Sequence, residues 1–296
     1  MNLAHFGLTR RPFRPTPDTD SYYPAAGHEA ALGGLRAAFA ARDGLALIDG
    51  EPGTGKTLVA LRFLEGLDAA VPRVLIPAPR FSRPADLHQA ILFDLGTEYR
   101  GQTEQELRLA VTEKLLVSLA GGHPIVIVLD EAQHLTADVL EEIRLLGNLE
   151  SRSAKAAFVV LVAHPSLRER LAGPELTAFA QRIAVRCRVE PMSPSESVEY
   201  LRHQVKAAGG RPDALVSDEA VDLIAARCKG VPRLLNQAAA LAFTLAGAAA
   251  ADEVDAEAAV EALDQLGLAE SPVERPTLIP HPGRSPKRRA PKRKSA

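Results

Sequence analysis

The chain has 296 residues, 46% of them hydrophobic and 24% charged, which is typical of a globular protein with room for one large domain and one small one. Cys187 and Cys228 have neither metal-site spacing nor a CxxC motif, so a zinc or disulfide scaffold is excluded and buried free thiols are expected. Residues 1–14 lack the apolar core of a secretory signal, and no stretch is apolar enough to span a bilayer. We therefore expect a cytoplasmic protein without a transmembrane segment.

Charge is distributed unevenly along the chain, although the net charge is only −2. Residues 269–296 carry eight Lys or Arg and two Glu, a balance of +6, and the rest of the chain carries −8. The basic residues gather at 284–294 between prolines, where little can be buried, so a disordered basic Pro-rich tail is predicted over 269–296. Two alternatives remain open: a tail that only contacts solvent, or an arm that binds nucleic acid or an anionic lipid surface.

A glycine-rich loop follows the first predicted strand. A Pro-rich entry at 11–17 precedes a predicted helix at 28–42, and the apolar run at 45–49 is typical of a buried strand. The next eight residues fit the phosphate-loop pattern G-x-x-x-x-G-K-[ST], and residues 58–67 then have helical spacing. The eight are Gly50, Glu51, Pro52, Gly53, Thr54, Gly55, Lys56 and Thr57. Because the strand–loop–helix context argues against a chance match, we interpret the loop as a nucleotide site.

Each residue type in this loop suits the binding of a triphosphate. Glycines let backbone N–H groups surround an anion without a Cβ clash, and the helix N-terminus adds a partial positive charge. Lys56 would reach the β- and γ-phosphates, and the Thr57 hydroxyl would bind Mg²⁺. ATP and Mg²⁺ are therefore the predicted ligands.

A second motif is expected to complete the site. Residues 124–129 form a near-continuous apolar run, as in a central parallel strand covered on both faces. The run ends in Asp130 and Glu131, at the strand edge where α/β sheets bind ligands. We assign Asp130 to Mg²⁺ and Glu131 to the activation of the water that attacks the γ-phosphate. This pair favours hydrolysis over nucleotide binding alone.

Alternating strands and helices fill the chain up to about residue 190. Beyond the segments above, the apolar pattern predicts strands at 74–76, 157–163 and 185–189 and helices at 84–95, 103–120 and 137–149. This order implies an α/β fold of the P-loop NTPase type with a doubly wound parallel sheet.

Only helices are predicted after residue 190. Ser193 and Glu196 form a capping box at the start of the first, with Pro194 at its first position. Further helices fit 217–228, 231–248 and 255–266. We therefore predict three parts: an αβα nucleotide-binding domain at 1–190 that opens with a distinct N-terminal segment at 1–44, a small all-helical lid domain at 191–268, and the tail at 269–296.

Several short motifs accompany the phosphate loop. They are His5-Phe6-Gly7-Leu8, Pro12-Phe13, Tyr22-Tyr23-Pro24, His28-Glu29-Ala30-Ala31-Leu32, Asp130-Glu131-Ala132-Gln133, Leu161 to Leu171, Gln181-Arg182-Ile183 and Gly230-Val231-Pro232-Arg233-Leu234-Leu235-Asn236-Gln237. In this combination the chain resembles AAA+ ATPases, and in particular the ATPase portion of the general secretion pathway protein A (ExeA-like) family. The resemblance spans about residues 1–268, and its start and end segments are the most specific to the family.

The resemblance implies a sensor role for His164. This residue ends the predicted strand at 157–163, where the family carries a polar sensor that contacts the γ-phosphate or its water. The family usually has Gly-Gln-Pro there, whereas this chain has Ala163-His164-Pro165. A neutral histidine can still donate a hydrogen bond. The alternative is a histidine that only caps a loop.

Two arginines also receive roles from the resemblance. Arg182 matches an arginine finger, which reaches the γ-phosphate of a neighbouring subunit and stabilises transition-state charge. Arg170 and Arg186 are nearby alternatives for that finger. Arg233 matches the second sensor, which links the nucleotide state to the angle of the lid.

The leading hypothesis is an ATP hydrolase that assembles as a homo-oligomer, such as a nucleotide-dependent ring, and uses ATP to drive assembly or conformational change. Its predicted catalytic residues are Glu131, Arg182, His164 and Arg233. The alternative is an ATP-switched DNA-binding regulator that resembles transposition ATPases, which the basic tail favours. A weaker alternative is an adaptor held at a membrane by the same tail.

Overall fold

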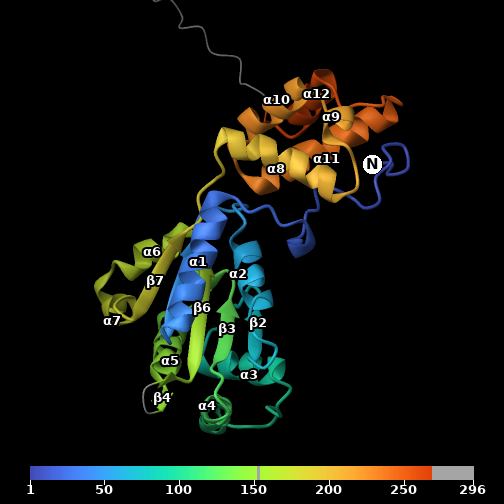
Figure 1. The fold of residues 1–296 in the computed structure, drawn as a ribbon. Helices are drawn as coiled ribbons and strands as arrows, with labels where there is room; N and C mark the ends of the chain where they lie inside the picture. The colour runs from blue at the N-terminus through green and yellow to red at the C-terminus, as the bar shows by residue number, and fades with distance from the viewer. Residues whose placement is uncertain (152–153, 269–296) are drawn as a thin grey trace, which may run out of the picture.

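The computed structural model describes residues 1–151 and 154–268, so the predicted basic tail at 269–296 lies outside the described residues. Figure 1 shows a sheet-containing unit below and an all-helical unit above, joined by the N-terminal segment and by the stretch after β7. Among the described residues, no helix is both long and apolar enough to cross a membrane.

A five-stranded parallel sheet forms the centre of the lower unit, with strand order β2-β3-β6-β1-β7. The strands are β1 (Leu45–Asp49), β2 (Arg73–Ile76), β3 (Ile125–Leu129), β6 (Ala157–Ala163) and β7 (Ile183–Arg188). β1, β3 and β6 are buried along their whole length, as expected for parallel strands covered on both faces. Their parallel register brings the carboxyl ends of β1 and β3 to one edge of the sheet.

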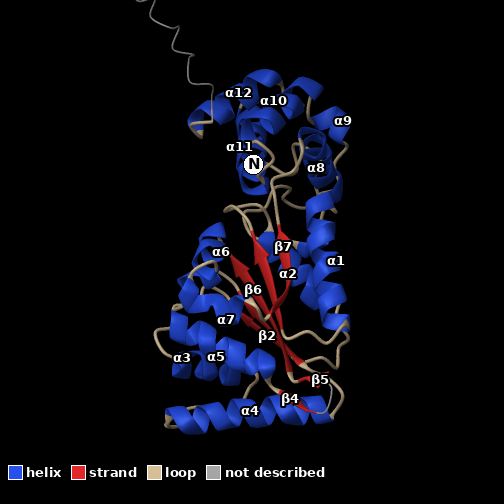
Figure 2. Ribbon diagram, turned by 90° about the vertical axis from the view of Figure 1, so that its left-hand side faces the viewer, coloured by secondary structure: helices blue, strands red, loops and turns tan. Residues whose placement is uncertain are grey.

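Helices cover both faces of this sheet, which confirms the predicted doubly wound α/β fold (Figure 2). On one face lie α1 (Ala26–Ala40) and α2 (Lys56–Glu65), packed around Phe63 and Phe158. The helices of the opposite face are α3 (Pro84–Asp94), α4 (Glu104–Ala120), α5 (Ala137–Asn148), α6 (Pro165–Leu171) and α7 (Thr177–Ala180). A short antiparallel pair, β4 (Glu150–Ser151) and β5 (Ala154–Lys155), lies beyond the main sheet and was not predicted.

Five helices form the framework of the upper unit. They are α8 (Pro194–Ala207), α9 (Pro212–Leu215), α10 (Asp218–Cys228), α11 (Pro232–Ala248) and α12 (Ala256–Gln265). The predicted capping box starts α8, because the Ser193 hydroxyl accepts from the Glu196 amide and the Glu196 carboxylate accepts from the Ser193 amide. We call α8 to α12 the lid. Both cysteines are free and buried, Cys187 in the sheet unit and Cys228 in the lid.

Residues 1–25 form a strap between the two units. Phe6, Leu8 and Phe13 are buried in the apolar core of the lid, and the ring of Phe6 meets that of Phe243 of α11 edge-on, with centroids 5.1 Å apart. The strap then reaches the sheet unit, where α1 begins at Ala26. The N-terminal segment thus contributes apolar side chains to the lid and a helix to the sheet unit.

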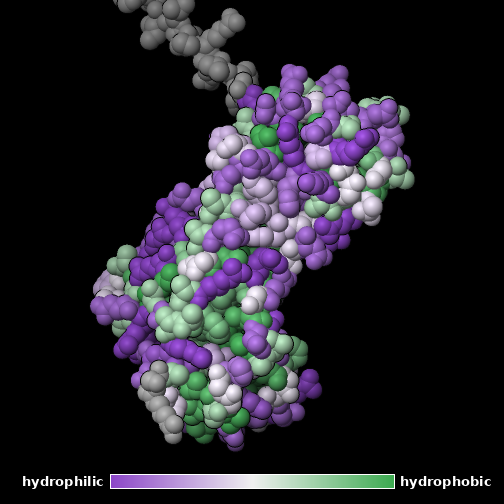
Figure 3. Space-filling view, viewed as in Figure 1, coloured by the Kyte–Doolittle hydropathy of each residue, from purple (hydrophilic) through white to green (hydrophobic). Residues whose placement is uncertain are grey.

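Some apolar side chains reach the surface at the far end of the sheet unit. Phe93 of α3 and Leu109 and Val117 of α4 are each more than half exposed. In the space-filling view, green atoms gather at the lower end of the molecule, where Figure 1 places α4 (Figure 3).

The packing of the strap predicts a large cost for removing one of its rings. Phe6→Ala should lower the free energy of unfolding by about 3 kcal/mol, because Phe6 is only 4% exposed and its loss leaves a cavity beside Phe243. Phe93→Ala, at a side chain that is 67% exposed, is the matched control and should cost less than about 1 kcal/mol. Guanidinium denaturation followed by circular dichroism measures both, and equal effects would contradict the buried role of Phe6.

Candidate nucleotide-binding site

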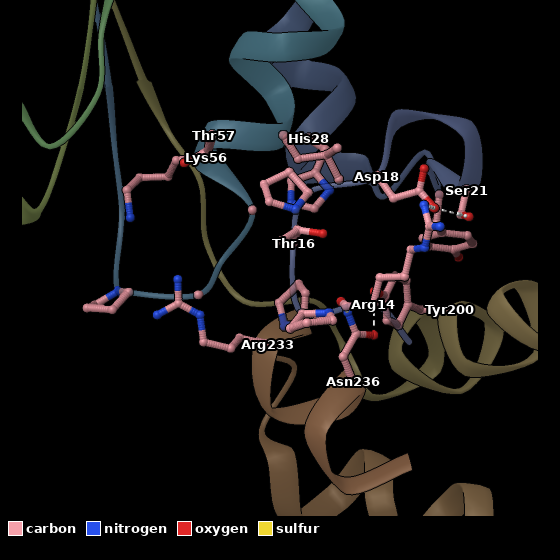
Figure 4. Close-up of a pocket in the computed structure, with 18 of the residues that line it drawn as sticks. Arg14, Thr16, Asp18, Ser21, His28, Lys56, Thr57, Tyr200, Arg233 and Asn236 are labelled. Carbon is pink, nitrogen blue, oxygen red and sulfur yellow. Dashed lines mark hydrogen bonds and ion pairs between the residues drawn. The ribbon is translucent and has the colours of Figure 1, made fainter. Parts of the chain in front are cut away.

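A cavity of about 210 Å³ lies where the phosphate loop, the strap and the lid meet (Figure 4). Lys56 and Thr57 line one end of it, and Tyr200 of α8 and Asn236 of α11 line the other, with His28 of α1 between them. The cavity is therefore elongated, with an anion-binding loop at one end and polar side chains at the other.

Two of the three glycines of the phosphate loop have backbone conformations that other residues rarely adopt. Gly53 and Gly55 have φ angles of +84° and +97°. A Cβ on Gly53 would lie 2.8 Å from the Cβ of Arg233, and a Cβ on Gly55 would lie 2.7 Å from Nε2 of His28. The loop is thus held open as a backbone cradle immediately before the N-terminus of α2, which suits a bound anion.

Thr57, the second residue of α2, and Asp130, the residue after β3, are brought together. The Thr57 hydroxyl donates to Oδ2 of Asp130 at 2.7 Å, and Asp130 is almost fully buried at the end of β3. A hydroxyl and a carboxylate beside a phosphate cradle are oxygen donors of the kind that Mg²⁺ prefers. These residues therefore fit a magnesium ion.

Lys56, the first residue of α2, lies among these groups. Its ammonium donates to the carbonyl oxygen of Glu51 at 2.9 Å, which folds the side chain across the loop. Burial lowers the pKa of the Lys56 ammonium from its ordinary value, and the nearby carboxylates of Glu131 and Asp130 oppose that change. A cation in this position can balance the charge of a bound phosphate.

Glu131 follows Asp130 in the left-handed conformation, with φ of +55° and ψ of +36°. Its carboxylate is exposed and borders the cavity, and it accepts a hydrogen bond from Nε2 of Gln133 at 2.5 Å. Oε1 of Gln133 in turn accepts from the backbone N–H of His164 at 3.0 Å. The predicted general base thus lies at the cavity with a side-chain partner of its own.

His164 has a capping role as well as a place in the cavity. Its Nδ1 accepts from the Ser166 amide at 3.2 Å and caps the N-terminus of α6. The same ring lines the cavity, and its Nε2 lies 3.6 Å from Oε2 of Glu51 in the phosphate loop. Because Nδ1 is an acceptor here, the proton of the neutral ring is on Nε2, facing Glu51.

Arg233 connects the lid directly to the phosphate loop. It is the second residue of α11, its side chain lines the cavity, and its backbone N–H donates to the carbonyl oxygen of Gly53 at 3.2 Å. The structure therefore brings the predicted second sensor into the site through both its backbone and its side chain (Figure 4).

The candidate arginine fingers lie outside this cavity. Arg182 is exposed just before β7, whose first residue, Ile183, pairs with Leu45 at the start of β1, so Arg182 is at the opposite end of the sheet from the phosphate loop. Arg186 of β7 donates to the carbonyl oxygen of Ala180. Arg170 of α6 donates to the carbonyl oxygens of Gln133 and Leu135 at 2.8 and 2.9 Å.

Sequence reasoning assigned no role to several residues that shape the site. Asp49, fully buried at the end of β1, forms an ion pair with Arg168 of α6. His28 Nε2 lies 2.7 Å from the carbonyl oxygen of Thr54 and steadies the loop from α1. The first contact joins residues that are 119 positions apart and the second joins residues that are 26 positions apart, so no local sequence pattern predicts them.

The strap and the lid supply the far end of the cavity. Asn236 accepts from the Tyr200 hydroxyl at 2.8 Å and donates to the carbonyl oxygen of Arg14 at 3.1 Å. Gln204 donates to the carbonyl oxygen of Ser21 at 2.9 Å. Asn236 belongs to one of the motifs that carried the family resemblance, and that motif pointed toward this end of the site.

The comparisons with known proteins agree with this geometry. The family model of the AAA domain matches residues 40–171. Among solved structures, Cdc6p from Pyrobaculum aerophilum has a TM-score of 0.67 at 18% identity, over 90% of this chain and 71% of that one. The Orc1 protein of Aeropyrum pernix, solved in complex with DNA, has a TM-score of 0.64 at 21% identity, over 85% and 68% of the two chains. Residues 40–171 therefore match the AAA domain family, and the chain has the P-loop fold of AAA+ ATPases.

A curated relative narrows the resemblance. General secretion pathway protein A of Aeromonas hydrophila is 33% identical over 237 residues, which cover 80% of this chain and 43% of the relative. The resemblance to the ATPase portion of that protein is confirmed. The chain spans less than half the length of this relative.

The ion pair between Arg168 and the buried Asp49 allows a test of whether this contact supports the site. Arg168→Ala should destabilise the protein by about 2 kcal/mol, because the fully buried Asp49 carboxylate loses its cation. Arg188→Ala removes an arginine from an exposed pair with Glu190 and should cost less than about 0.5 kcal/mol. Thermal unfolding compares the two variants. An unchanged stability of Arg168→Ala would show that the pair does not support the site.

Proposed function

We propose that the protein binds ATP with Mg²⁺ and hydrolyses it. The observation that carries the proposal is the 2.7 Å hydrogen bond between Thr57 and Asp130, two oxygen ligands 73 positions apart that meet beside the phosphate cradle. Because an ATP-dependent site needs a compartment that holds ATP, we place the protein in the cytoplasm.

The roles of the individual residues follow from their positions. Bound Mg²⁺, held by Thr57 and Asp130, would neutralise phosphate charge. Lys56 and the loop amides bind the phosphates, and Glu131 accepts a proton from the attacking water. His164 and Arg233 contact the phosphate end of the nucleotide from β6 and from the lid. Nucleotide binding is thereby coupled to the position of the lid, since Arg233 is the second residue of α11.

A complete site needs a second copy of the chain in this proposal. Arg182 is exposed at the end of the sheet away from its own phosphate loop, so it can only reach a nucleotide that another subunit holds. An arginine supplied in this way stabilises the charge of the transition state. We therefore propose a homo-oligomer, such as a ring, that forms when nucleotide binds and completes each site at a subunit boundary.

Separating binding from turnover tests the proposed hydrolysis. Glu131→Gln keeps the size of the side chain but removes the base, so it should retain ATP affinity and lose about 100-fold or more in kcat. Lys56→Ala should abolish tight binding, since it removes the cation that faces the phosphates. Isothermal titration calorimetry with Mg²⁺–ATP and a phosphate-release assay measure the two properties.

Two results would contradict the proposal. Unchanged steady-state hydrolysis in Glu131→Gln would remove Glu131 from its role. Wild-type affinity in Lys56→Ala would reject the phosphate loop as the binding site.

A DNA-binding regulator is the second candidate, favoured by the cluster of Lys and Arg at 284–294, which lies outside the described residues. If it is correct, ATP should strengthen salt-sensitive binding to duplex DNA, and removal of 284–296 should weaken it by at least tenfold. Gel mobility at two salt concentrations measures this. The basic residues can also be replaced by neutral ones. If DNA binding is then lost while binding to anionic vesicles is unchanged, the partner of these residues is DNA and not a membrane surface.

A further inference from the structure

We propose that Gln133 is a positioning residue for hydrolysis, which holds the Glu131 carboxylate in place and ties it to the end of β6. This inference rests on the proposed ATPase function. Gln133 lines the cavity two residues after Glu131, in the short helix at Ala132–His134.

Two of the three hydrogen bonds of the Gln133 amide fix its orientation, and the third joins its nitrogen to Nε2 of His134. A carboxylate can only accept, so the Gln133 atom 2.5 Å from Glu131 is the NH₂ group. A backbone N–H can only donate, so the atom 3.0 Å from the His164 amide is the carbonyl oxygen. The two contacts assign the amide consistently, and a rotated amide would lose both bonds. A side chain that bridges a carboxylate and a backbone N–H needs a donor and an acceptor, which glutamine supplies.

The backbone of Gln133 is held as well. Arg170 of α6 donates to the carbonyl oxygens of Gln133 and Leu135, so the turn after Glu131 is clamped to α6. His164 also belongs to this assembly, since its ring caps the same helix. The Gln133 side chain therefore starts from a fixed backbone and ends on a fixed amide.

Glu131 needs such support more than an ordinary strand-end carboxylate does. Its side chain is exposed, and among the hydrogen bonds of the described residues the bond from Gln133 is the one that reaches its carboxylate. The charged neighbours are Lys56, which lines the cavity, and Asp130, and Nε2 of His134 lies 3.3 Å from the Gln133 amide nitrogen. Because a general base works only within hydrogen-bond reach of its water, losing the tether should reduce turnover.

The test compares three variants that fold on the same framework. Gln133→Leu removes all three side-chain hydrogen bonds, and Gln133→Glu keeps the length but replaces the donor with a second carboxylate. Both should lower kcat about 10- to 100-fold while the KM for ATP and the calorimetric Kd stay within about twofold. Gln265→Leu is the matched control, because Gln265 makes the same type of bond to Glu261 on the exposed face of α12, and it should leave all three constants unchanged.

The outcomes separate this inference from the function on which it rests. Unchanged kcat in Gln133→Leu, in a protein whose Glu131→Gln variant is impaired, would overturn the positioning role alone. A rise in kcat would also overturn it, since Gln133 would then restrain Glu131 rather than align it. If KM and Kd rise together, or if Gln133→Leu alone has a lower melting temperature, the positioning role is wrong and Gln133 has only a structural role. Unimpaired Glu131→Gln would instead reject the proposed function.

Discussion

The end of the sheet, α1 and the lid all approach the backbone of the phosphate loop closely, and the arrangement of the structure depends on these contacts. A Cβ on Gly50 would lie 2.2 Å from the carbonyl oxygen of Val189 after β7, while Gly53 faces Arg233 of the lid and Gly55 faces His28 of α1. Each glycine therefore admits a different neighbour. The loop between β1 and α2 is the point where the sheet, the first helix and the lid touch, and its backbone hydrogen bonds can shift only if those neighbours shift too.

The site depends on the parallel register of the sheet as much as on the loop. β1 and β3 both pair with β6, so their carboxyl ends deliver the phosphate loop and Asp130 to one edge. His164 and α6 follow β6 directly. His164 contacts Glu51 and Gln133, and Arg168 of α6 pairs with Asp49. Three neighbouring strands thus place the glycine-rich loop, the acids Asp130 and Glu131, and His164 at adjacent positions of the same edge.

The parts of the fold that the sequence predicted well are those with local signals. The buried strands β1, β3 and β6 are unbroken apolar runs, the Ser193–Glu196 capping box has a fixed spacing, and the phosphate loop has required residue types. The strap was harder, because Phe6, Leu8 and Phe13 lie in turns without periodicity and their burial depends on a helix more than 200 positions away.

The polar contacts of the site escaped prediction for a related reason. Asp49 with Arg168 and Gln133 with His164 join residues far apart in sequence, and only the folded sheet brings them together. Glu131 was predicted as a base from its place after a strand, but its left-handed backbone and its amide partner are properties of the turn, which no periodic pattern encodes. The end of a strand thus predicts where a catalytic side chain lies, whereas the conformation of the following turn determines its orientation.

The packing of the first residues into the lid has a consequence for how this molecule can be divided. The upper unit is discontinuous in sequence, since its core takes Phe6 and Phe13 from one end of the chain and Phe243 from the other. No single cut can release that unit intact. A fragment that starts at the phosphate strand would leave its hydrophobic interior open to water, so both ends of the chain must be kept for either unit to be studied in native form.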